Sequence, residues 1–460
     1  MNTYFNCHSH TMYSNIRLLD SINRPKDLID KAIELGLSGI AITDHECLSA
    51  HMEVNQYAKE IKKEYPNFKI ALGNEIYLID ERHPGQPYYH FLLIAKNAEG
   101  HKALRELSSI AWYNMYSDRG LDRVPITKEE LTNIVKKYPN TLIATTACMG
   151  GELSKLALSY NKARAAADNS AITEFGNKIV EFVNFCKNLF GGDFYIECAP
   201  ANTKDQIIVN AQLETIARSC KVKMVAGTDA HYLTKEQRQV HKAYLNSKDG
   251  DREVDSFYEF SRLMDYAEAE YLLSLSLIDS EKPLINTLEI MNKIEDYSLE
   301  QKQIIPKVEV KDYTQNSLFY YLSPQKYPTL VKLQTSLNKQ ERYWVNECLF
   351  ELERKNLWSN EYIERLEIEA DIIDYIGQQL DDCLFAYFNT FKHYIDLFWE
   401  CGSIVGPGRG SATGFLSNYL LGITQLDPLR WEINYWRFLN KERAELPSLL
   451  LMLGSCKKRV

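Results

Sequence analysis

Histidine, carboxylate and cysteine side chains recur at six places where short apolar runs of this sequence end. Two of these places share a pattern, because His8 and His10 flank a serine while Asp229 and His231 flank an alanine. Alternate side chains of an extended segment point to the same side, so each pair can reach one metal ion. The whole set comprises His8, His10, Asp20, Asp44, His45, Glu75, His90, Cys148, Asp229 and His231.

The mixture of ligand types indicates a metal and a chemistry. Imidazole, carboxylate and thiolate together suit Zn²⁺ or Mn²⁺ better than Mg²⁺, which stays as an alternative. A multinuclear site of this kind activates water for attack on a phosphate ester. The set therefore predicts a phosphoester-hydrolysing metal site.

Each part of this set also has an ordinary explanation. An Asp-His pair is common at helix starts, and a lone cysteine after an apolar run is usually a buried thiol. Glu75 would be a plain surface carboxylate, except that Gly73 before it is expected to let the backbone turn tightly. The coincidence of all the parts at predicted strand ends favours the metal site. We interpret the other histidines as structural or exposed: His51, His83, His101, His241 and His393.

These side chains must be positioned by alternating strands and helices in about the first 235 residues. We expect strands at 38–43, 70–79, 91–95, 142–145, 194–197 and 224–226. Helices are predicted at 25–35, 127–137, 161–189 and 204–220, and Thr127 with Glu130 forms a capping box at the second of them. Repeated strand–helix units predict a parallel sheet closed into a distorted barrel. In such barrels the chemistry lies at the carboxyl ends of the strands.

The remainder of the chain has a different pattern. A polar, acidic stretch at 246–255 is expected to mark the edge of the first domain, and from about residue 280 the pattern is helical, most clearly at 362–380 and 388–399. We expect an α/β protein, in which a distorted (β/α) barrel precedes a mostly helical α+β domain. The predicted limits are 1–275 for the metal-dependent domain, 276–447 for the second domain and 448–460 for a divergent tail.

A glycine-rich segment at 406–414 predicts a second binding chemistry. Glycines let successive backbone N–H groups point inward as a nest for anions, and a following helix offers its positive end. Arg409 would add charge-assisted hydrogen bonds to phosphate oxygens, and Ser411 a hydroxyl. Although such loops are often mere turns, this composition before a predicted helix favours phosphate binding by Gly408, Arg409, Gly410 and Ser411.

Composition limits the classes of protein that need to be considered. The sequence is 45% hydrophobic and 25% charged, as in ordinary globular proteins. No run approaches the roughly 20 apolar residues of a membrane span, and the N-terminus lacks the features of a signal peptide, so we expect a cytoplasmic location. The ten cysteines include no CxxC pair and are read as reduced thiols. A net charge of −9 argues against generic coating of DNA but leaves nucleic-acid substrates open.

These motifs resemble the PHP (polymerase and histidinol phosphatase) domain and, over nearly the whole chain, the first part of bacterial DNA polymerase III alpha subunits of family C. The matching segments are 8–14, 42–45, 90–97, 228–233, 362–367, 405–411, 419–424 and 437–443. The resemblance implies a fully occupied three-metal cluster and a 3′–5′ exonuclease or phosphoesterase activity, with Asp44 orienting a ligand. The nine implied ligands are His8, His10, Asp20, His45, Glu75, His90, Cys148, Asp229 and His231.

The resemblance also implies roles within this set and in the second domain. His8, His10, Glu75, Asp229 and His231 would be the catalytic core. The Gly410–Ser411 pair would grip the triphosphate of an incoming nucleotide in a partial polymerase palm. After Arg443 the family continues to aspartates that hold two magnesium ions, and at those positions this sequence has Ser448, Leu450 and Met452.

Leucine and methionine cannot bind the ions that two-metal phosphoryl transfer needs. We therefore expect no nucleotide addition by this chain alone. A degenerate copy, a shifted reading frame or a truncated gene would each produce this tail.

Three functions follow from these observations. The favoured hypothesis is a PHP nuclease or phosphoesterase within a DNA polymerase III alpha-like protein of DNA replication. The alternatives are a non-catalytic DNA- or nucleotide-binding fragment of a replicative polymerase and a small-molecule phosphatase. The expected partner is DNA, and the resemblance adds nucleotides and either other replication proteins or a second polymerase polypeptide. No membrane partner is expected.

Overall fold

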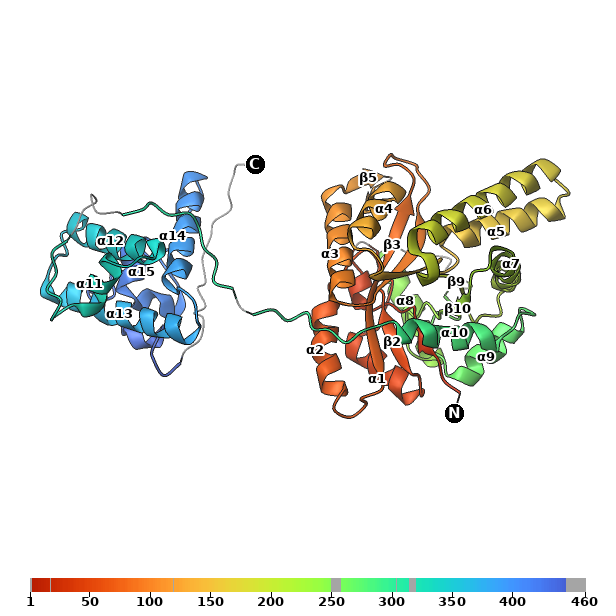
Figure 1. Cartoon of the computed structure of the whole chain (residues 1–460), viewed down its shortest axis with the longest axis horizontal. Coiled ribbons are helices and arrows are strands. Elements are labelled where there is room, and N and C mark those ends of the chain that lie inside the picture. The colour runs from red at the N-terminus through yellow and green to blue at the C-terminus, as the bar shows by residue number, and fades with distance from the viewer. Residues whose placement is uncertain are drawn as a thin grey trace. The chain divides into compact units, whose positions relative to one another are not determined.

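The chain forms two compact units, Met1–Gln301 and Lys302–Val460, in a computed structural model (Figure 1). The structure describes residues 2–16, 18–118, 120–249, 258–302, 304–313 and 320–443. The predicted tail at 448–460 and most of the predicted acidic break at 246–255 lie outside these residues.

The first unit is built around one sheet that closes into a barrel. Its strands follow the order β1-β2-β3-β4-β8-β9-β10, and β7 pairs with β3. An isolated bridge between Ser9 and Ala230 joins the two ends of this order, with a hydrogen bond from His10 N to Ala230 O of 2.9 Å. The strands are β1 (Phe5–Asn6), β2 (Gly39–Ile42), β3 (Lys69–Ile79), β4 (Tyr89–Ala95), β7 (Ile126–Thr127), β8 (Leu142–Thr145), β9 (Phe194–Cys198) and β10 (Met224–Ala226).

Helices cover the outside of this barrel (Figure 1). Their apolar side chains pack against it. In α1, for example, Leu28, Ile29 and Ala32 share one buried face, as the sequence pattern predicts. The helices are α1 (Pro25–Glu34), α2 (His51–Ile61), α3 (Ala98–Tyr113), α4 (Lys128–Lys137), α5 (Glu152–Ala165), α6 (Asn169–Phe190), α7 (Lys204–Cys220), α8 (Arg238–Asp249), α9 (Tyr266–Ser274) and α10 (Glu281–Asn292). Strands β5 (Tyr116–Asp118) and β6 (Leu121–Arg123) form a separate two-stranded sheet.

Several predicted elements agree with the structure to the residue, and one is wrong. The strands at 142–145 and 224–226 and the helix at 204–220 are β8, β10 and α7. The capping box of Thr127 and Glu130 is present at the start of α4. The single helix predicted at 161–189 is instead an antiparallel pair, α5 and α6, because Ala167 adopts a φ of +52° and the Asp168 side chain caps α6.

The prediction of an all-parallel sheet is also wrong. Strand β4 runs antiparallel to both β3 and β8, whereas β1, β2, β3, β8, β9 and β10 pair in parallel where they are neighbours. The reason is the connection, because the segment between β3 and β4 spans only residues 80–88 and contains no helix. A parallel pair would need a crossover of a dozen or more residues.

The first unit extends beyond the predicted limit at residue 275. Helix α10 lies beyond that limit, yet it packs against β1 and β10. Ile290 of this helix and Ile294, two residues beyond its end, are buried with Phe5, Ala41 and other side chains of the barrel interior. Thr287 accepts a hydrogen bond of 2.9 Å from the backbone N–H of Phe5. The helix therefore closes one end of the barrel and belongs to the first unit, which ends at residue 301.

The second unit is mostly helical, as predicted. Its helices are α11 (Pro328–Gln334), α12 (Lys339–Arg354), α13 (Asn360–Gln379), α14 (Phe385–Glu400) and α15 (Leu416–Leu420). Its core contains Trp344, Phe385, Phe388 and Phe415. The described residues of this unit contain no β-strand beyond an isolated bridge between Asn440 and Arg443. Among all residues that the structure describes, no helix is long and apolar enough to cross a membrane.

Candidate metal centre

The predicted ligands meet at one end of the barrel. His8 and His10 follow β1, His45 follows β2, and Cys148 follows β8. Asp229 and His231 follow β10 in the same way. Because these strands are parallel where they pair, their carboxyl ends share one edge, as the sequence analysis expected.

Glu75 and His90 reach this edge by a different route, because neither follows the end of a strand. Strand β3 is longer than β2, which pairs with it only as far as Leu72, so Glu75 extends past the end of its neighbour. His90 is the second residue of β4, and the start of this antiparallel strand lies at the same edge as the ends of the others.

Gly73 has a different role from the predicted one. It lies within β3 and makes no turn. A Cβ at this position would lie 2.5 Å from the carbonyl oxygen of Leu93 and 2.8 Å from Thr43. Close packing between β3 and its neighbours, rather than backbone bending, therefore requires glycine here.

Four ligands form the most compact group of the centre. The Nε2 atoms of His8 and His10 are 3.1 Å apart. Oδ1 of Asp229 lies 3.3 Å from the first of these atoms and 3.1 Å from the second. Glu75 directs one carboxylate oxygen to each histidine, at 3.4 and 3.3 Å. All four side chains are buried.

A second group extends the centre through His10. It joins His10, Asp20, His45 and His231, whose ligand atoms lie within 4.8 Å of one another. His231 Nε2 is 3.1 Å from Asp20 Oδ1, and His45 Nε2 is 3.7 Å from Asp20 Oδ2. The structure thus brings Asp20, which comes from a loop, to ligands that follow strands.

A third group consists of His45, Glu75 and His90, and Cys148 lies next to it. His45 Nδ1 lies 2.9 Å from Glu75 Oε2, and His90 Nδ1 lies 3.0 Å from Glu75 Oε1. The Cys148 Sγ atom is 3.5 Å from His90 Nδ1 and 3.9 Å from Glu75 Oε1. All nine predicted ligands therefore come together, and His10, His45 and Glu75 each belong to two groups.

Three of the histidines, His8, His10 and His231, are held so that Nε2 faces the centre. His8 Nδ1 bonds to Glu197 Oε1 at 2.6 Å, His10 Nδ1 to the Ser14 hydroxyl at 3.2 Å, and His231 Nδ1 to the Asp229 carbonyl oxygen at 2.7 Å. A bond at one ring nitrogen fixes the tautomer and frees the other as a ligand. This assignment follows from the hydrogen-bond network.

Asp44 acts on the centre through another residue. Its Oδ1 accepts hydrogen bonds from the Ser14 hydroxyl at 2.7 Å and from Thr11 N at 2.6 Å. Ser14 in turn contacts His10. Asp44 therefore helps to orient a ligand without belonging to any of the three groups.

Glu197 is a residue of the candidate site that the sequence analysis missed. It is buried in β9 and accepts hydrogen bonds from His8 and from the Thr145 hydroxyl. The available signal was a glutamate within the otherwise apolar run of Phe194–Cys198, which is buried throughout. A buried carboxylate needs a partner, so such a residue indicates a polar site nearby.

Electrostatic interactions favour the charged form of three carboxylates and of His10 in this centre. Burial opposes ionisation, but neighbouring histidines outweigh it and keep the pKa of Asp20, Glu75 and Asp229 below the usual range. Burial likewise opposes protonation of His10, yet the nearby carboxylates of Asp229 and Glu75 raise its pKa to about 10. Burial, followed by the charges of Asp229 and Glu75, raises the pKa of the Cys148 thiol.

The donor atoms fit divalent cations. Buried polar atoms normally have hydrogen-bond partners. Five nitrogen and oxygen atoms of the predicted ligands have no described partner of acceptable geometry: Asp20 Oδ2, His45 Nδ1, Glu75 Oε2, Asp229 Oδ1 and His231 Nε2. Donors around a tetrahedral Zn²⁺ at roughly 2.0–2.1 Å lie about 3.3 Å apart. The distances of 3.1–3.4 Å in the most compact group agree with that spacing.

Backbone strain occurs beside the ligands. Glu46, Ala147 and Asp229 adopt φ values of +55°, +55° and +47°. Such values are uncommon for residues other than glycine and cluster at functional sites. They turn the chain sharply at the positions where His45, Cys148 and Asp229 face the centre.

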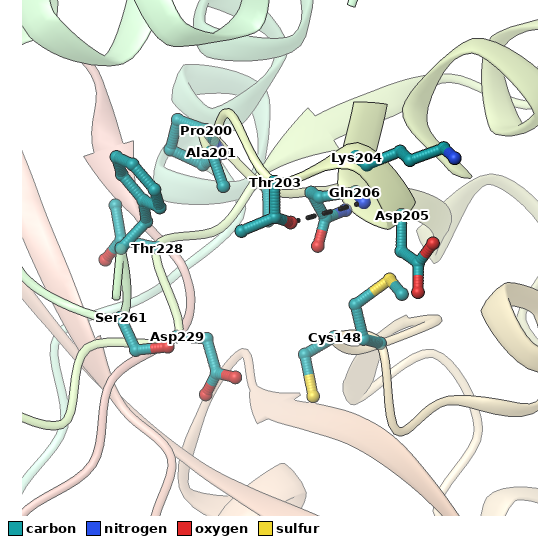
Figure 2. A pocket seen from close by; sticks show the side chains of 13 residues that line it. Cys148, Pro200, Ala201, Thr203, Lys204, Asp205, Gln206, Thr228, Asp229 and Ser261 are labelled. Carbon is teal, nitrogen blue, oxygen red and sulfur yellow. Dashed lines mark hydrogen bonds between the residues drawn. The ribbon is translucent and has the colours of Figure 1, made fainter. Parts of the chain in front are cut away.

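A cavity of about 290 Å³ opens next to the ligands. Figure 2 shows Cys148 and Asp229 on one side of it and the start of α7, with Thr203, Lys204 and Asp205, on the other. Phe260 and Ser261 also line this cavity. The cavity is therefore bounded by ligands of the metal centre, by the N-terminus of α7 and by the Phe260 ring.

The glycine-rich segment lies in the second unit. Gly408 has a φ of +126°, and a Cβ there would lie 2.8 Å from Thr413 Cγ2. Arg409 is exposed and makes no hydrogen bond or ion pair with other described residues. The helix expected after this segment is short, because a 3-10 turn at Gly410–Gly414 precedes the five residues of α15.

Comparison with known proteins identifies the class of the first unit. Residues 6–201 match the PHP domain family, and together with the barrel and its buried ligands this makes the first unit a PHP domain. Residues 331–449 match the bacterial DNA polymerase III alpha NTPase domain. The chain is therefore a homologue of bacterial DNA polymerase III alpha subunits, which confirms the resemblance seen in the sequence.

Two relatives illustrate the extent of this similarity. The chain is 38% identical to the probable DNA polymerase YorL of Bacillus subtilis, over 96% of this chain and 36% of the relative. It is 30% identical to the DNA polymerase III subunit alpha of Aquifex aeolicus, over 97% of this chain and 36% of the relative. The chain thus spans little more than a third of the length of these curated relatives.

Solved structures also align with part of the chain. Histidinol phosphate phosphatase from Lactococcus lactis, complexed with zinc, L-histidinol and phosphate, gives a TM-score of 0.28 at 14% identity, covering 54% of this chain and 95% of its own. PsfC from Pseudomonas syringae gives a TM-score of 0.29 at 13% identity, covering 63% of this chain and all of its own.

Proposed function

We propose that the first unit is a metal-dependent phosphodiesterase that removes nucleotides from the 3′ end of DNA. The observation that carries this proposal is the convergence of nine ligand side chains, several with buried donor atoms that lack hydrogen-bond partners. Similarity to DNA polymerases supports DNA as the substrate. Zn²⁺ or Mn²⁺ fits the mixed donor set better than Mg²⁺.

The residues divide by role in this proposal. His8, His10, Glu75, Asp229 and His231 would hold the central ions, and Asp20, His45, His90 and Cys148 would complete a three-ion cluster. Bound divalent cations would supply Lewis acidity toward the phosphate and lower the pKa of water.

The neighbouring cavity gives the substrate room beside these ligands. Its volume of about 290 Å³ suits a small group such as one terminal nucleotide. Lys204 at the cavity places a positive charge near an incoming phosphate, and the N-terminus of α7 adds its partial positive charge.

Metal content and nuclease activity test the proposal together. We expect the purified chain to bind more than one Zn²⁺ or Mn²⁺ and to shorten a 5′-labelled oligonucleotide from its 3′ end. The double variant His8→Ala with His10→Ala should lose metal and reduce the rate more than about 100-fold. His393→Ala is the control, because this histidine is exposed in the second unit.

Two results would contradict the proposal. One is less than one metal ion per chain, and the other is an unchanged rate in the double variant. Faster hydrolysis of a simple phosphate monoester than of DNA would instead favour a small-molecule phosphatase. Binding of DNA without any hydrolysis in the presence of Zn²⁺ or Mn²⁺ would favour a non-catalytic fragment.

We also propose that Gly408, Arg409, Gly410 and Ser411 bind the phosphates of a nucleotide. The match of residues 331–449 to an NTPase domain supports this site. Arg409 also supports it, because it is exposed and makes no hydrogen bond or ion pair with the other described residues. Arg409→Ala should weaken binding of a deoxynucleoside triphosphate about tenfold or more, since it removes a charge-assisted hydrogen bond. Arg430→Ala, another exposed arginine of this unit, should bind normally. Equal affinities of the two variants would contradict the site.

A further inference from the structure

The β3–β4 ribbon continues past the metal centre as a row of aromatic rings. Side chains alternate along a strand, so Tyr77 shares a face with Glu75, and Tyr88 shares a face with His90. Tyr88 immediately precedes β4, while Tyr77 pairs directly with His90 across the two strands. The face that supplies two ligands therefore also presents two tyrosines.

Ring contacts connect this row to the centre. The Tyr77 ring lies 5.7 Å from His45 and 5.0 Å from His90, measured between centroids. Tyr88 follows at 5.0 Å from Tyr77. Tyr77 is partly buried, whereas the Tyr88 side chain is 37% exposed. The row thus leads from the ligands to the surface.

An arginine from another element completes this surface. The Arg123 guanidinium, at the end of β6, lies 4.6 Å from the Tyr88 ring centroid and donates a hydrogen bond of 2.8 Å to its hydroxyl. Its Nε atom is buried and has no hydrogen-bond partner among the residues that the structure describes. We name Tyr77, Tyr88 and Arg123 the tyrosine track.

We infer that the tyrosine track binds unpaired nucleotides of DNA next to the scissile phosphate, so that the substrate is a single-stranded 3′ end. This inference rests on the proposed nuclease function and specifies its substrate. Aromatic rings stack with bases of any sequence, and a nearby arginine adds charge. Bases within a duplex are already stacked on each other, so only an unpaired strand offers its base faces to these rings.

The charge of the chain supports stacking as the means of recognition. A net charge of −9 gives little general attraction to phosphates. Contacts between bases and rings must then carry a larger share of the affinity. The track lies beside the ligands, so a strand stacked on it would enter the metal centre directly.

Fluorescence anisotropy with a short 5′-labelled oligothymidylate tests this inference. The full chain is titrated in the presence of EDTA, which removes metal and prevents hydrolysis. Tyr88→Ala should weaken binding about 5- to 150-fold, the range for loss of one base–ring stack. Tyr88→Phe keeps the ring and should retain most of the affinity. Tyr65→Ala is the matched control, because this tyrosine is 41% exposed near the opposite end of β3.

Three results would overturn the inference. They are no measurable binding by the unsubstituted chain, equal binding by Tyr88→Ala and the unsubstituted chain, and equal binding of a blunt duplex and the single strand. Hydrolysis of the same oligonucleotide with Mn²⁺ separates the two proposals. Tyr88-dependent binding without hydrolysis would contradict the nuclease but support the track. If Tyr88→Ala and the unsubstituted chain hydrolyse the oligonucleotide at equal rates at a subsaturating concentration, the nuclease is supported and the track is contradicted.

Discussion

Glu197 determines which nitrogen of His8 faces the metal centre. Its carboxylate lies 2.6 Å from His8 Nδ1, and both side chains are buried. A carboxylate behind a ligating imidazole holds the ring and increases its basicity. Glu197 also bonds to the Thr145 hydroxyl, so its own orientation is fixed.

We predict that Glu197→Gln weakens metal binding and slows hydrolysis about 10- to 100-fold, because the amide keeps the shape but not the charge. Metal affinity measured by competition with a chelating dye gives the direct readout. Glu289→Gln is the control, since Glu289 contacts Tyr195 on a neighbouring part of the unit and no ligand. Equal metal affinities in both variants would show that Glu197 does not position His8.

A second prediction concerns His51 and His101, which the sequence analysis interpreted as structural or exposed. Both are buried, with His51 Nδ1 3.0 Å from His101 Nε2 and His51 Nε2 3.0 Å from the Gly73 carbonyl oxygen. Burial, and in His51 also the charge of His101, lowers the pKa of His51 to about 3. Burial lowers that of His101 to about 4.

These folded-state pKa values lie below the unfolded value of about 6.5, so the unfolded chain binds the protons first as the pH falls. The pair should therefore cost no stability above about pH 6.5 and progressively more below it, down to about pH 4 for His101 and about pH 3 for His51. The slope approaches about 1.4 kcal/mol per pH unit for each histidine. Urea unfolding at several pH values should show a shallower acid decline in His51→Gln with His101→Gln. Parallel declines would refute this account.

At the scale of elements, the sequence predicted most strands and helices but not all their directions. Apolar runs such as Leu142–Thr145 mark strands clearly, and the capping box of Thr127 marks a helix start. Strand direction depends on the connection, and nothing in the apolar pattern of β4 distinguishes antiparallel from parallel pairing. The sequence also did not predict the role of α10, because the apolar pattern of this helix is the same whether it packs against a barrel or in a separate domain.

Glu369 in the second unit is, like Glu197, a buried carboxylate that is held by hydrogen bonds. This buried carboxylate of α13 accepts hydrogen bonds from the backbone N–H groups of Leu416 and Ser417, at 2.6 and 2.8 Å. Arg365 donates to it at 2.9 Å and also bonds to the Gly414 carbonyl oxygen. The pair therefore anchors the chain that follows the glycine-rich segment.

We predict that Glu369→Ala lowers the free energy of unfolding of the second unit by about 3–5 kcal/mol, because Arg365 and two amides lose their partner. Tryptophan fluorescence during urea unfolding reports on this unit, which holds five of the six tryptophans: Trp344, Trp358, Trp399, Trp431 and Trp436.

The control for this prediction lies on the same helix. Glu364 is 53% exposed and pairs with Lys326, so Glu364→Ala should cost less than about 1 kcal/mol. A similar loss in both variants would mean that Glu369 contributes no more than a surface charge.

At the scale of the whole molecule, metal binding should affect only one of the two units. All nine predicted ligands belong to residues 1–301, and a ligand that binds only the folded state stabilises it. Calorimetry should therefore show two melting transitions, of which added Zn²⁺ or Mn²⁺ raises only one. The double variant His8→Ala with His10→Ala should abolish this shift. A shift of both transitions would indicate that the units unfold together.

The candidate site was more predictable than the fold that builds it. Ligand types are visible in the sequence because histidines and carboxylates beside apolar runs are unusual, and the resemblance supplied the full set. Residues that act through a ligand, such as Glu197 and Ser14, show only ordinary side chains until the barrel brings them together. The C-terminal limit of the first unit could not be predicted either, because it depends on whether α10 packs against the barrel or against the second unit.

The bridge between Ser9 and Ala230 has a consequence for synthesis of the chain. It closes the barrel between segments that lie more than 200 residues apart, and the ligands His8, His10, Asp229 and His231 flank it. A nascent chain that ends before this point lacks Asp229 and His231, and its barrel cannot close. Metal capture should therefore come late during translation, once residue 231 has left the ribosome. Metal retention by stalled chains of increasing length would reveal the moment of barrel closure.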